Sequence, residues 1–74
     1  MQIIDKIIEI ARLELGIADI SADDRFGDIG ADSLEVVSLY LAVAKEFNVD
    51  FDESMIAETA SELAQEVEKL LARA

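Results

Sequence analysis

The hydroxyl group of Ser33 is the main candidate for chemistry in this sequence, because it lies where an acidic stretch meets an apolar segment. Asp32 and Glu35 have the three-residue spacing of a capping box, which predicts that a helix begins here. Gly30 precedes them and can adopt backbone angles that other residues avoid. Ser33 is then the first helical residue, with its side chain directed outward from the helix N-terminus. Because the free N–H groups at such an end favour a phosphate, this hydroxyl is well placed to carry a phosphate ester.

The same stretch has two simpler interpretations. Asp and Ser are ordinary helix caps, and that role requires no further chemistry. The acidic residues from Asp24 to Glu35 also have some of the spacing of a calcium loop. However, Phe26 stands at its third position, where an oxygen ligand is needed, and Ile29 at its sixth, where the sharp turn needs glycine. We therefore reject the calcium site, and the ordinary cap remains as an alternative.

Catalysis has little support in the composition. The chain contains no histidine and no cysteine, so the usual pairs of nucleophile and base are absent and no zinc site is expected. The carboxylates are concentrated in an acidic stretch, where solvation is their expected role. We therefore expect that the protein is not an enzyme.

The charge of the chain is strongly negative, with 17 acidic and 6 basic residues and a net charge of −11. Nucleic acids and anionic membranes are poor partners for such a surface, whereas enzymes with basic patches are suitable ones. The longest uncharged run, residues 36–44, is too short to cross a bilayer. Charges interrupt the apolar N-terminal segment, unlike a signal peptide. We expect a cytoplasmic protein without membrane contact.

The remaining pattern predicts one small all-α domain over residues 1–74. Apolar residues recur at helical spacing in three longer segments, about residues 2–15, 33–47 and 60–72. Residues 16–32 lose this period but keep Ile20, Phe26 and Ile29. A disordered linker would hardly carry these side chains, so we expect a long ordered loop that they anchor.

A fourth, short helix is expected over residues 53–58. Asp52 would cap this helix, and Ile56 would face the core. Thr59 and Glu62 have the spacing of a second capping box, which would start the last helix. The predicted fold is thus a helical bundle of three longer helices and one short helix.

The segment 33–47 is apolar almost all round. Its apolar residues form two stripes, which are Leu34, Val37, Leu41 and Ala44 on one side and Val36, Tyr40, Val43 and Phe47 on the other. So small a domain cannot bury both stripes, and some of these residues must face a partner or a cavity.

The motif Gly30-Ala31-Asp32-Ser33-Leu34, with Phe26 and Asp28-Ile29 upstream, resembles the attachment motif of the acyl carrier proteins. The resemblance covers essentially the whole chain. In that family, the serine of the Asp-Ser-Leu triplet is esterified with 4′-phosphopantetheine from coenzyme A. The resemblance thus implies that Ser33 carries this cofactor and that Asp32 supports its recognition by the transferase. It also implies a partner-binding surface, which consists of Asp28, Leu34, Glu35 and Val37. For Leu34 and Val37, core packing is the alternative.

The function that the resemblance implies is that of an acyl carrier protein in fatty-acid or related lipid or polyketide biosynthesis. Such a carrier is a monomer that holds acyl intermediates as thioesters on its phosphopantetheine arm. Its partners are a phosphopantetheinyl transferase and acyl-loading and acyl-transfer enzymes with basic docking patches. Common fatty-acid carriers have an acidic row after the serine, where this chain has Ser38, Ala44 and Lys45. We therefore expect a specialised set of partners.

Two other functions stay open at this point. A peptidyl or aminoacyl carrier would use the same serine, although Asp32 and the strong acidity favour an acyl carrier. An unmodified helical adaptor would instead dock through an amphipathic surface made of Val36, Leu39, Tyr40 and Val43.

Overall fold

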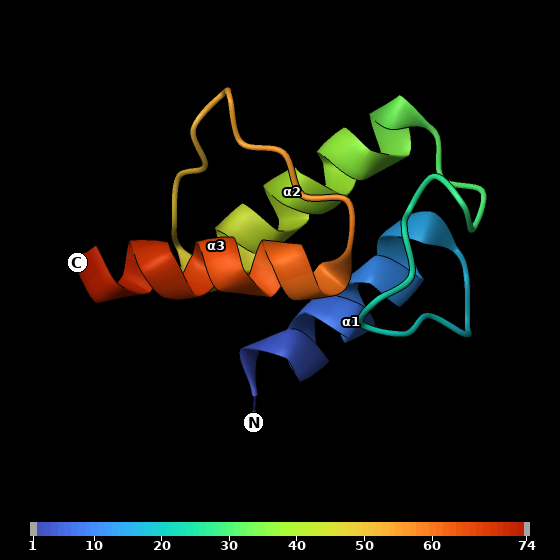
Figure 1. Cartoon of the computed structure of the whole chain (residues 1–74), viewed down its shortest axis with the longest axis horizontal. Helices are drawn as coiled ribbons and strands as arrows, with labels where there is room; N and C mark the ends of the chain where they lie inside the picture. The colour runs from blue at the N-terminus through green and yellow to red at the C-terminus, as the bar shows by residue number, and fades with distance from the viewer. Residues whose placement is uncertain (1, 74) are drawn as a thin grey trace.

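The computed structural model describes residues 2–73, which form three helices and no strand. The helices are α1 (Ile3–Leu15), α2 (Ser33–Phe47) and α3 (Ala60–Arg73). In Figure 1, α1 and α2 slant in the same direction while α3 runs horizontally, and α1 packs against both other helices. The expected all-α fold with three longer helices is confirmed.

Local sequence sets the ends of α1 and α2. Gly16 follows α1 with a φ of 67°, and its N–H donates to the carbonyl of Arg12 at 3.0 Å. This left-handed conformation is the usual helix stop and favours glycine. Asn48 ends α2 in the same region, with a φ of 54°. The first helix, expected over about residues 2–15, therefore ends where the sequence predicts.

One face of each helix builds the core. The largest side chains that are fully buried are Ile7, Phe26, Leu39, Val43, Leu63 and Val67. The pairs Leu39–Val43 and Leu63–Val67 are each four residues apart, so each pair lies on one face of its helix. The helix α2 is apolar on two sides, but only the side with Leu39 and Val43 is buried in the core.

The long loop between α1 and α2 is anchored as predicted. Phe26 is only 1% exposed and Ile20 is buried. The N–H of Phe26 donates to the carbonyl of Glu58 at 2.8 Å, and that of Ser61 to the carbonyl of Ala22 at 3.0 Å. These bonds join the loop to the segment before α3 and to the first turn of α3 (Figure 1).

The short helix expected over residues 53–58 is absent, and that prediction was wrong. Asp52 accepts hydrogen bonds from the N–H and the hydroxyl of Ser54, both at 2.9 Å, and so forms a tight turn. The N–H and the carbonyl of Ala57 are both bonded to the hydroxyl of Tyr40. A helix over residues 53–58 would need the N–H of Ala57 for a bond to the carbonyl of Glu53, and the Tyr40 hydroxyl accepts from that N–H instead. The segment is therefore an irregular connection. Ile56 was also misplaced, because it is 77% exposed rather than in the core.

The second capping box is only half formed. Thr59 accepts a hydrogen bond from the N–H of Glu62 at 3.1 Å, as expected of a cap. The carboxylate of Glu62, however, accepts from the N–H of Glu58 at 3.0 Å, one residue earlier than predicted.

Candidate functional site

Ser33 is the first residue of α2, and its side chain is exposed. Asp32 is the N-cap: its Oδ1 accepts from the N–H of Glu35 at 2.8 Å, and Oε1 of Glu35 accepts from the N–H of Asp32 at 3.1 Å. The predicted capping box is therefore complete. It fixes the backbone on both sides of Ser33, while among residues 2–73 no side-chain hydrogen bond holds the Ser33 hydroxyl.

The loop before α2 sets the position of this serine. Gly30 has a φ of 97°, which supports the predicted need for glycine here. After this turn, the N–H of Ala31 donates to the carbonyl of Phe26 at 3.0 Å. Because Phe26 is buried in the core, the chain leading to Ser33 is attached to the core only two residues before it.

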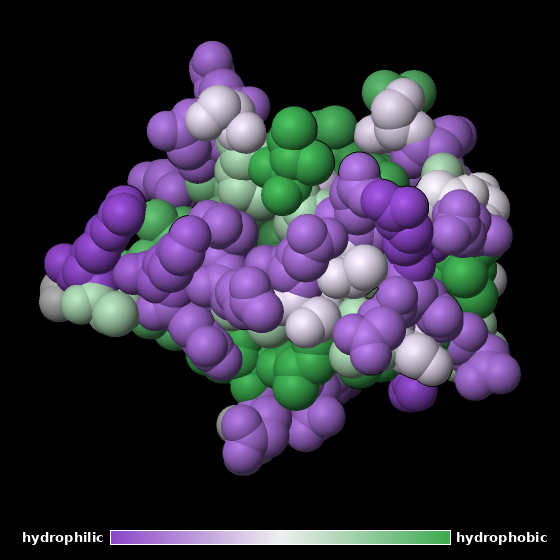
Figure 2. All heavy atoms as spheres, viewed as in Figure 1, coloured by the Kyte–Doolittle hydropathy of each residue, from purple (hydrophilic) through white to green (hydrophobic). Residues whose placement is uncertain are grey.

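The face of α2 that follows Ser33 is apolar and exposed. Leu34 is 78% exposed, Val37 51% and Leu41 67%, and their spacing of three and four residues places them on one side of the helix. Figure 2 shows hydrophobic side chains over α2 and the connection to α3, on a surface that is otherwise largely hydrophilic. Core packing of Leu34 and Val37, the alternative considered from the sequence, was therefore wrong.

The adaptor surface considered from the sequence is not available. Leu39 and Val43 are both fully buried in the core. Val36 and Tyr40 are half-buried beside them. An unmodified adaptor that docks through these four residues is therefore excluded.

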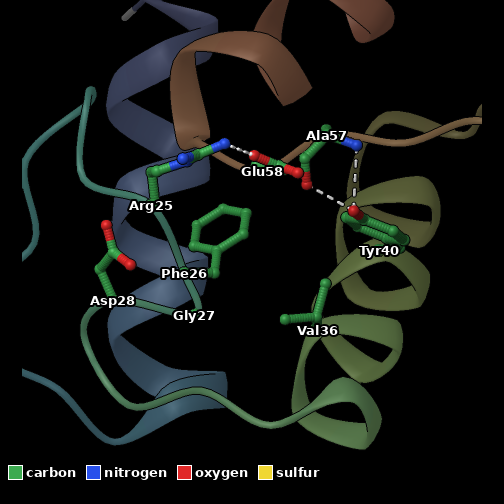
Figure 3. Close-up of a pocket in the computed structure, with 8 residues that line it drawn as sticks. All are labelled: Arg25, Phe26, Gly27, Asp28, Val36, Tyr40, Ala57 and Glu58. Carbon is green, nitrogen blue, oxygen red and sulfur yellow. Dashed lines mark hydrogen bonds and ion pairs between the residues drawn. The ribbon is translucent and has the colours of Figure 1, made fainter.

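The predicted acidic partner residues differ in their surroundings. Asp28 is exposed and lies on the loop before α2 (Figure 3). Glu35 is half-buried, and its carboxylate bonds to the backbone of the cap. Arg25, which is close to this site, forms an ion pair with Glu58. The hydrogen bond that Arg25 donates to Glu58, and then the negative charge of that carboxylate, raise the pKa of Arg25, so Glu58 compensates this cation.

Two of the hollows beside α2 are lined by Tyr40. The first, called the Phe26 hollow, has a volume of about 410 Å³; its side chains come from Arg25, Phe26, Asp28, Val36, Tyr40 and Glu58 (Figure 3). The second, called the Met55 hollow, has a volume of about 520 Å³. Its apolar lining comes from Val37, Tyr40, Leu41, Ala44, Phe51 and Met55, and Asp50, Asp52 and Glu53 line it as well. Val36 and Val37 are each about one helical turn from Ser33, so both hollows begin close to the candidate site.

Comparison with known proteins identifies the family of the chain. Residues 5–67 match the family described as "Phosphopantetheine attachment site". The chain belongs to this family. Its members are carriers and not enzymes, and the group that they carry is covalently attached 4′-phosphopantetheine. The resemblance that was noted in the sequence is thereby confirmed.

Curated relatives of this carrier are named as acyl carrier proteins. "Acyl carrier protein 1, chloroplastic" from Spinacia oleracea is 37% identical over 73 residues, which cover 92% of this chain and 53% of the relative. The protein of the same name from Hordeum vulgare is 32% identical, with 92% and 49% covered. "Acyl carrier protein, chloroplastic" from Brassica napus is 30% identical, with 92% and 54% covered. The chain thus spans about half the length of the curated relatives it matches.

The start of α2 fits the phosphopantetheine group. The hydroxyl of Ser33 is exposed at a helix N-terminus, where backbone N–H groups and the helix dipole favour a phosphate. The exposed apolar face of α2 and the Met55 hollow can receive an apolar chain one turn away. No helix within residues 2–73 is long and apolar enough to cross a membrane, and no cluster of ligand side chains in that range could hold a metal ion.

Sequence reasoning missed two features of this region. Nothing in the sequence indicates the hydrogen bonds between Tyr40 and Ala57, because these residues are 17 positions apart and Ala57 contributes only backbone groups. The exposure of Leu41 did have a signal, since it belongs to the same stripe as Leu34 and Val37. Periodicity alone could not tell which of the two stripes of α2 faces the core.

Proposed function

We propose that this protein is an acyl carrier for fatty-acid or related lipid or polyketide biosynthesis, with its phosphopantetheine attached to Ser33. The observation that carries the proposal is the exposed hydroxyl of Ser33 as the first side chain of α2, directly after a complete capping box. When it is attached, the group supplies a terminal thiol that holds acyl groups as thioesters. The residues around Ser33 then have to orient this group and present it to partner enzymes.

Attachment requires the Ser33 oxygen to bond to the phosphorus of the pantetheine phosphate in coenzyme A. The hydroxyl loses its proton, and the nucleotide part of coenzyme A leaves. The N-terminus of α2 counters the negative charge of the phosphodiester that forms. Asp32 keeps the helix start in place through its bond to Glu35, and its carboxylate is the proposed recognition point for the transferase.

The partner-binding surface is proposed on the same side of the molecule. Leu34 and Val37 supply exposed apolar contacts beside Ser33. Asp28 and Glu35 supply negative charge for a basic patch on the transferase or on an acyl-handling enzyme. We propose that the carrier acts as a monomer, because one copy presents the serine and this surface together.

A specialised set of partners is also proposed. Ser38 and Lys45 are exposed on α2, where common fatty-acid carriers continue their acidic row. A lysine on this face weakens docking to a basic patch and so changes partner choice. Measured at low salt, the association rate with a ketosynthase of general fatty-acid synthesis should be lower than that of a common carrier. Equal rates would refute the specialisation.

The location of the protein stays a prediction. The sequence predicts a cytoplasmic carrier, whereas the names of the relatives place those proteins in the chloroplast. The proposed function needs only that the transferase and the acyl-handling enzymes share its compartment.

The test of the proposed function is intact mass after incubation with coenzyme A, magnesium and a broad-specificity phosphopantetheinyl transferase. The unchanged chain should gain the mass of one phosphopantetheine. Ser33→Ala should gain nothing, and the control Ser38→Ala, which removes another exposed hydroxyl from α2, should be modified like the parent. No gain in the parent, or a gain in Ser33→Ala, would refute the assignment.

A further inference from the structure

The Met55 hollow and the Phe26 hollow share a side chain, since Tyr40 lines both. We propose that Tyr40 is the partition between them and thereby limits the length of the acyl chain that the carrier can shelter. This inference rests on the proposed function, because it takes the occupant to be a chain attached through residue 33.

The ring of Tyr40 is held at both ends. Its Cα belongs to α2, and its hydroxyl accepts from the N–H of Ala57 at 3.1 Å while donating to the carbonyl of the same residue. Ala57 is buried and lies on the irregular connection before α3. The ring also meets the edge of Phe51, with 6.4 Å between centroids and 62° between planes. Tyr40 therefore spans the space between α2 and the connection, as Figure 3 shows.

An alkyl chain attached at residue 33 should bind in the Met55 hollow in preference to the Phe26 hollow. Each hollow has three charged lining residues, which are Asp50, Asp52 and Glu53 in the Met55 hollow and Arg25, Asp28 and Glu58 in the Phe26 hollow. The Met55 hollow, however, has six apolar or aromatic lining side chains, whereas the Phe26 hollow has four. Each methylene that leaves water favours the buried state by about fourfold. The Met55 hollow is therefore the better site for an alkyl chain, because it offers more apolar surface for the chain to cover.

Tyr40 lies seven residues after Ser33, or about 10 Å further along the helix axis. A short chain can fill the Met55 hollow beside this ring without disturbing it. A longer chain must either leave its end in water or displace the ring from Ala57, which breaks both hydrogen bonds. The stabilisation that an attached chain gives should therefore grow with length and then stop.

Because the sequence contains no cysteine, Ser33→Cys creates a unique thiol. Alkyl methanethiosulfonates of graded length can be attached to it: the thiolate attacks the reagent sulfur, a disulfide forms and methanesulfinate leaves. The melting temperature is then measured against alkyl length with Tyr40, Tyr40→Phe or Tyr40→Val in the same background. Gln65→Cys serves as the control, since residue 65 is exposed on α3 and no residue of α3 lines either hollow.

With Tyr40 in place, the melting temperature should rise by up to about 3–6 °C for each buried methylene and then level off. Tyr40→Phe frees the ring from Ala57, so the rise should continue to longer chains, and Tyr40→Val should extend it further. Chains on Gln65→Cys should give no such rise. If Tyr40→Val does not fold, the comparison of tyrosine with phenylalanine decides.

The same levelling point in all variants, or no rise with Tyr40 in place, would overturn the proposal. The thiol chemistry does not use the transferase. The melting-temperature series can therefore refute the role of Tyr40 without bearing on the carrier function, which the mass measurement tests separately.

Discussion

Removal of the Asp32 side chain should destabilise the protein by about 1 kcal/mol, within a range of roughly 0.5–2 kcal/mol. The Asp32→Ala variant loses the 2.8 Å bond from the N–H of Glu35 to the Asp32 carboxylate. The backbone N–H of residue 32 is still present and can still donate to the Glu35 carboxylate. Half of the capping box thus survives. For a domain of 74 residues, this loss corresponds to a fall of about 4–8 °C in melting temperature.

Asp32→Asn separates the cap from the charge. Asparagine is as good an N-cap as aspartate, so it should keep the bond to Glu35 and lose only the interaction of a negative charge with the helix dipole. Its loss of stability should be clearly smaller than that of Asp32→Ala. Asp19→Ala is the matched control, because Asp19 is exposed and within residues 2–73 makes no side-chain hydrogen bond.

The assay is urea denaturation of the unmodified protein followed by circular dichroism, together with the rate of phosphopantetheine attachment. If Asp32→Asn folds stably but is modified slowly, the carboxylate is needed for recognition as well as for the cap. Equal destabilisation by asparagine and alanine at position 32 would refute the capping argument. So would an Asp19→Ala variant as unstable as Asp32→Ala.

Three further predictions concern the stability of the fold. Phe26→Ala should cost about 3–5 kcal/mol, because it empties a site that is only 1% exposed in a domain stabilised by roughly 4–11 kcal/mol; an unchanged urea midpoint would contradict this. Hydrogen bonds from the N–H and then the hydroxyl of Ser54 lower the pKa of Asp52 from its ordinary 3.8. The folded state therefore binds that proton less tightly than the unfolded state, so this contribution is complete above about pH 4 and is lost as the pH falls further. The stability difference between the parent and Asp52→Asn should shrink in that range, and a constant difference would argue against it. Finally, the net charge of −11 predicts a higher melting temperature at about 0.15 M than at about 0.01 M sodium chloride, as screening shortens from about 30 to 8 Å; no change would contradict the self-repulsion argument.

Sequence reasoning worked where one local interaction decides the structure. The capping box of Asp32 and Glu35, the stop at Gly16 and the anchoring of the loop by Phe26 all follow from residue types at short spacing. Each of these features depends on few neighbours. The position of Ser33 at the start of α2 could be predicted for that reason.

It failed where a distant side chain competes with a local pattern. Residues 53–58 have a plausible cap and apolar residues, but the Tyr40 hydroxyl accepts from the N–H of Ala57, which a helix would need. Ile56 is exposed for the same reason, since its orientation follows the irregular backbone. A contact between residues 17 positions apart has no signature in periodicity.

The two apolar stripes of α2 connect this small fold with its proposed role. Leu39 and Val43 face the core and are fully buried, while Leu34 and Leu41 face outward and are mostly exposed. Full burial of such a leucine would contribute about 1.5–3 kcal/mol, so the outward stripe withholds stabilisation that is large beside the total. The exposed stripe begins directly after Ser33, on the helix whose N-terminus favours a phosphate. A surface that costs stability and lies beside the attachment residue is best explained by contacts that form only when the arm, its cargo or a partner enzyme is present.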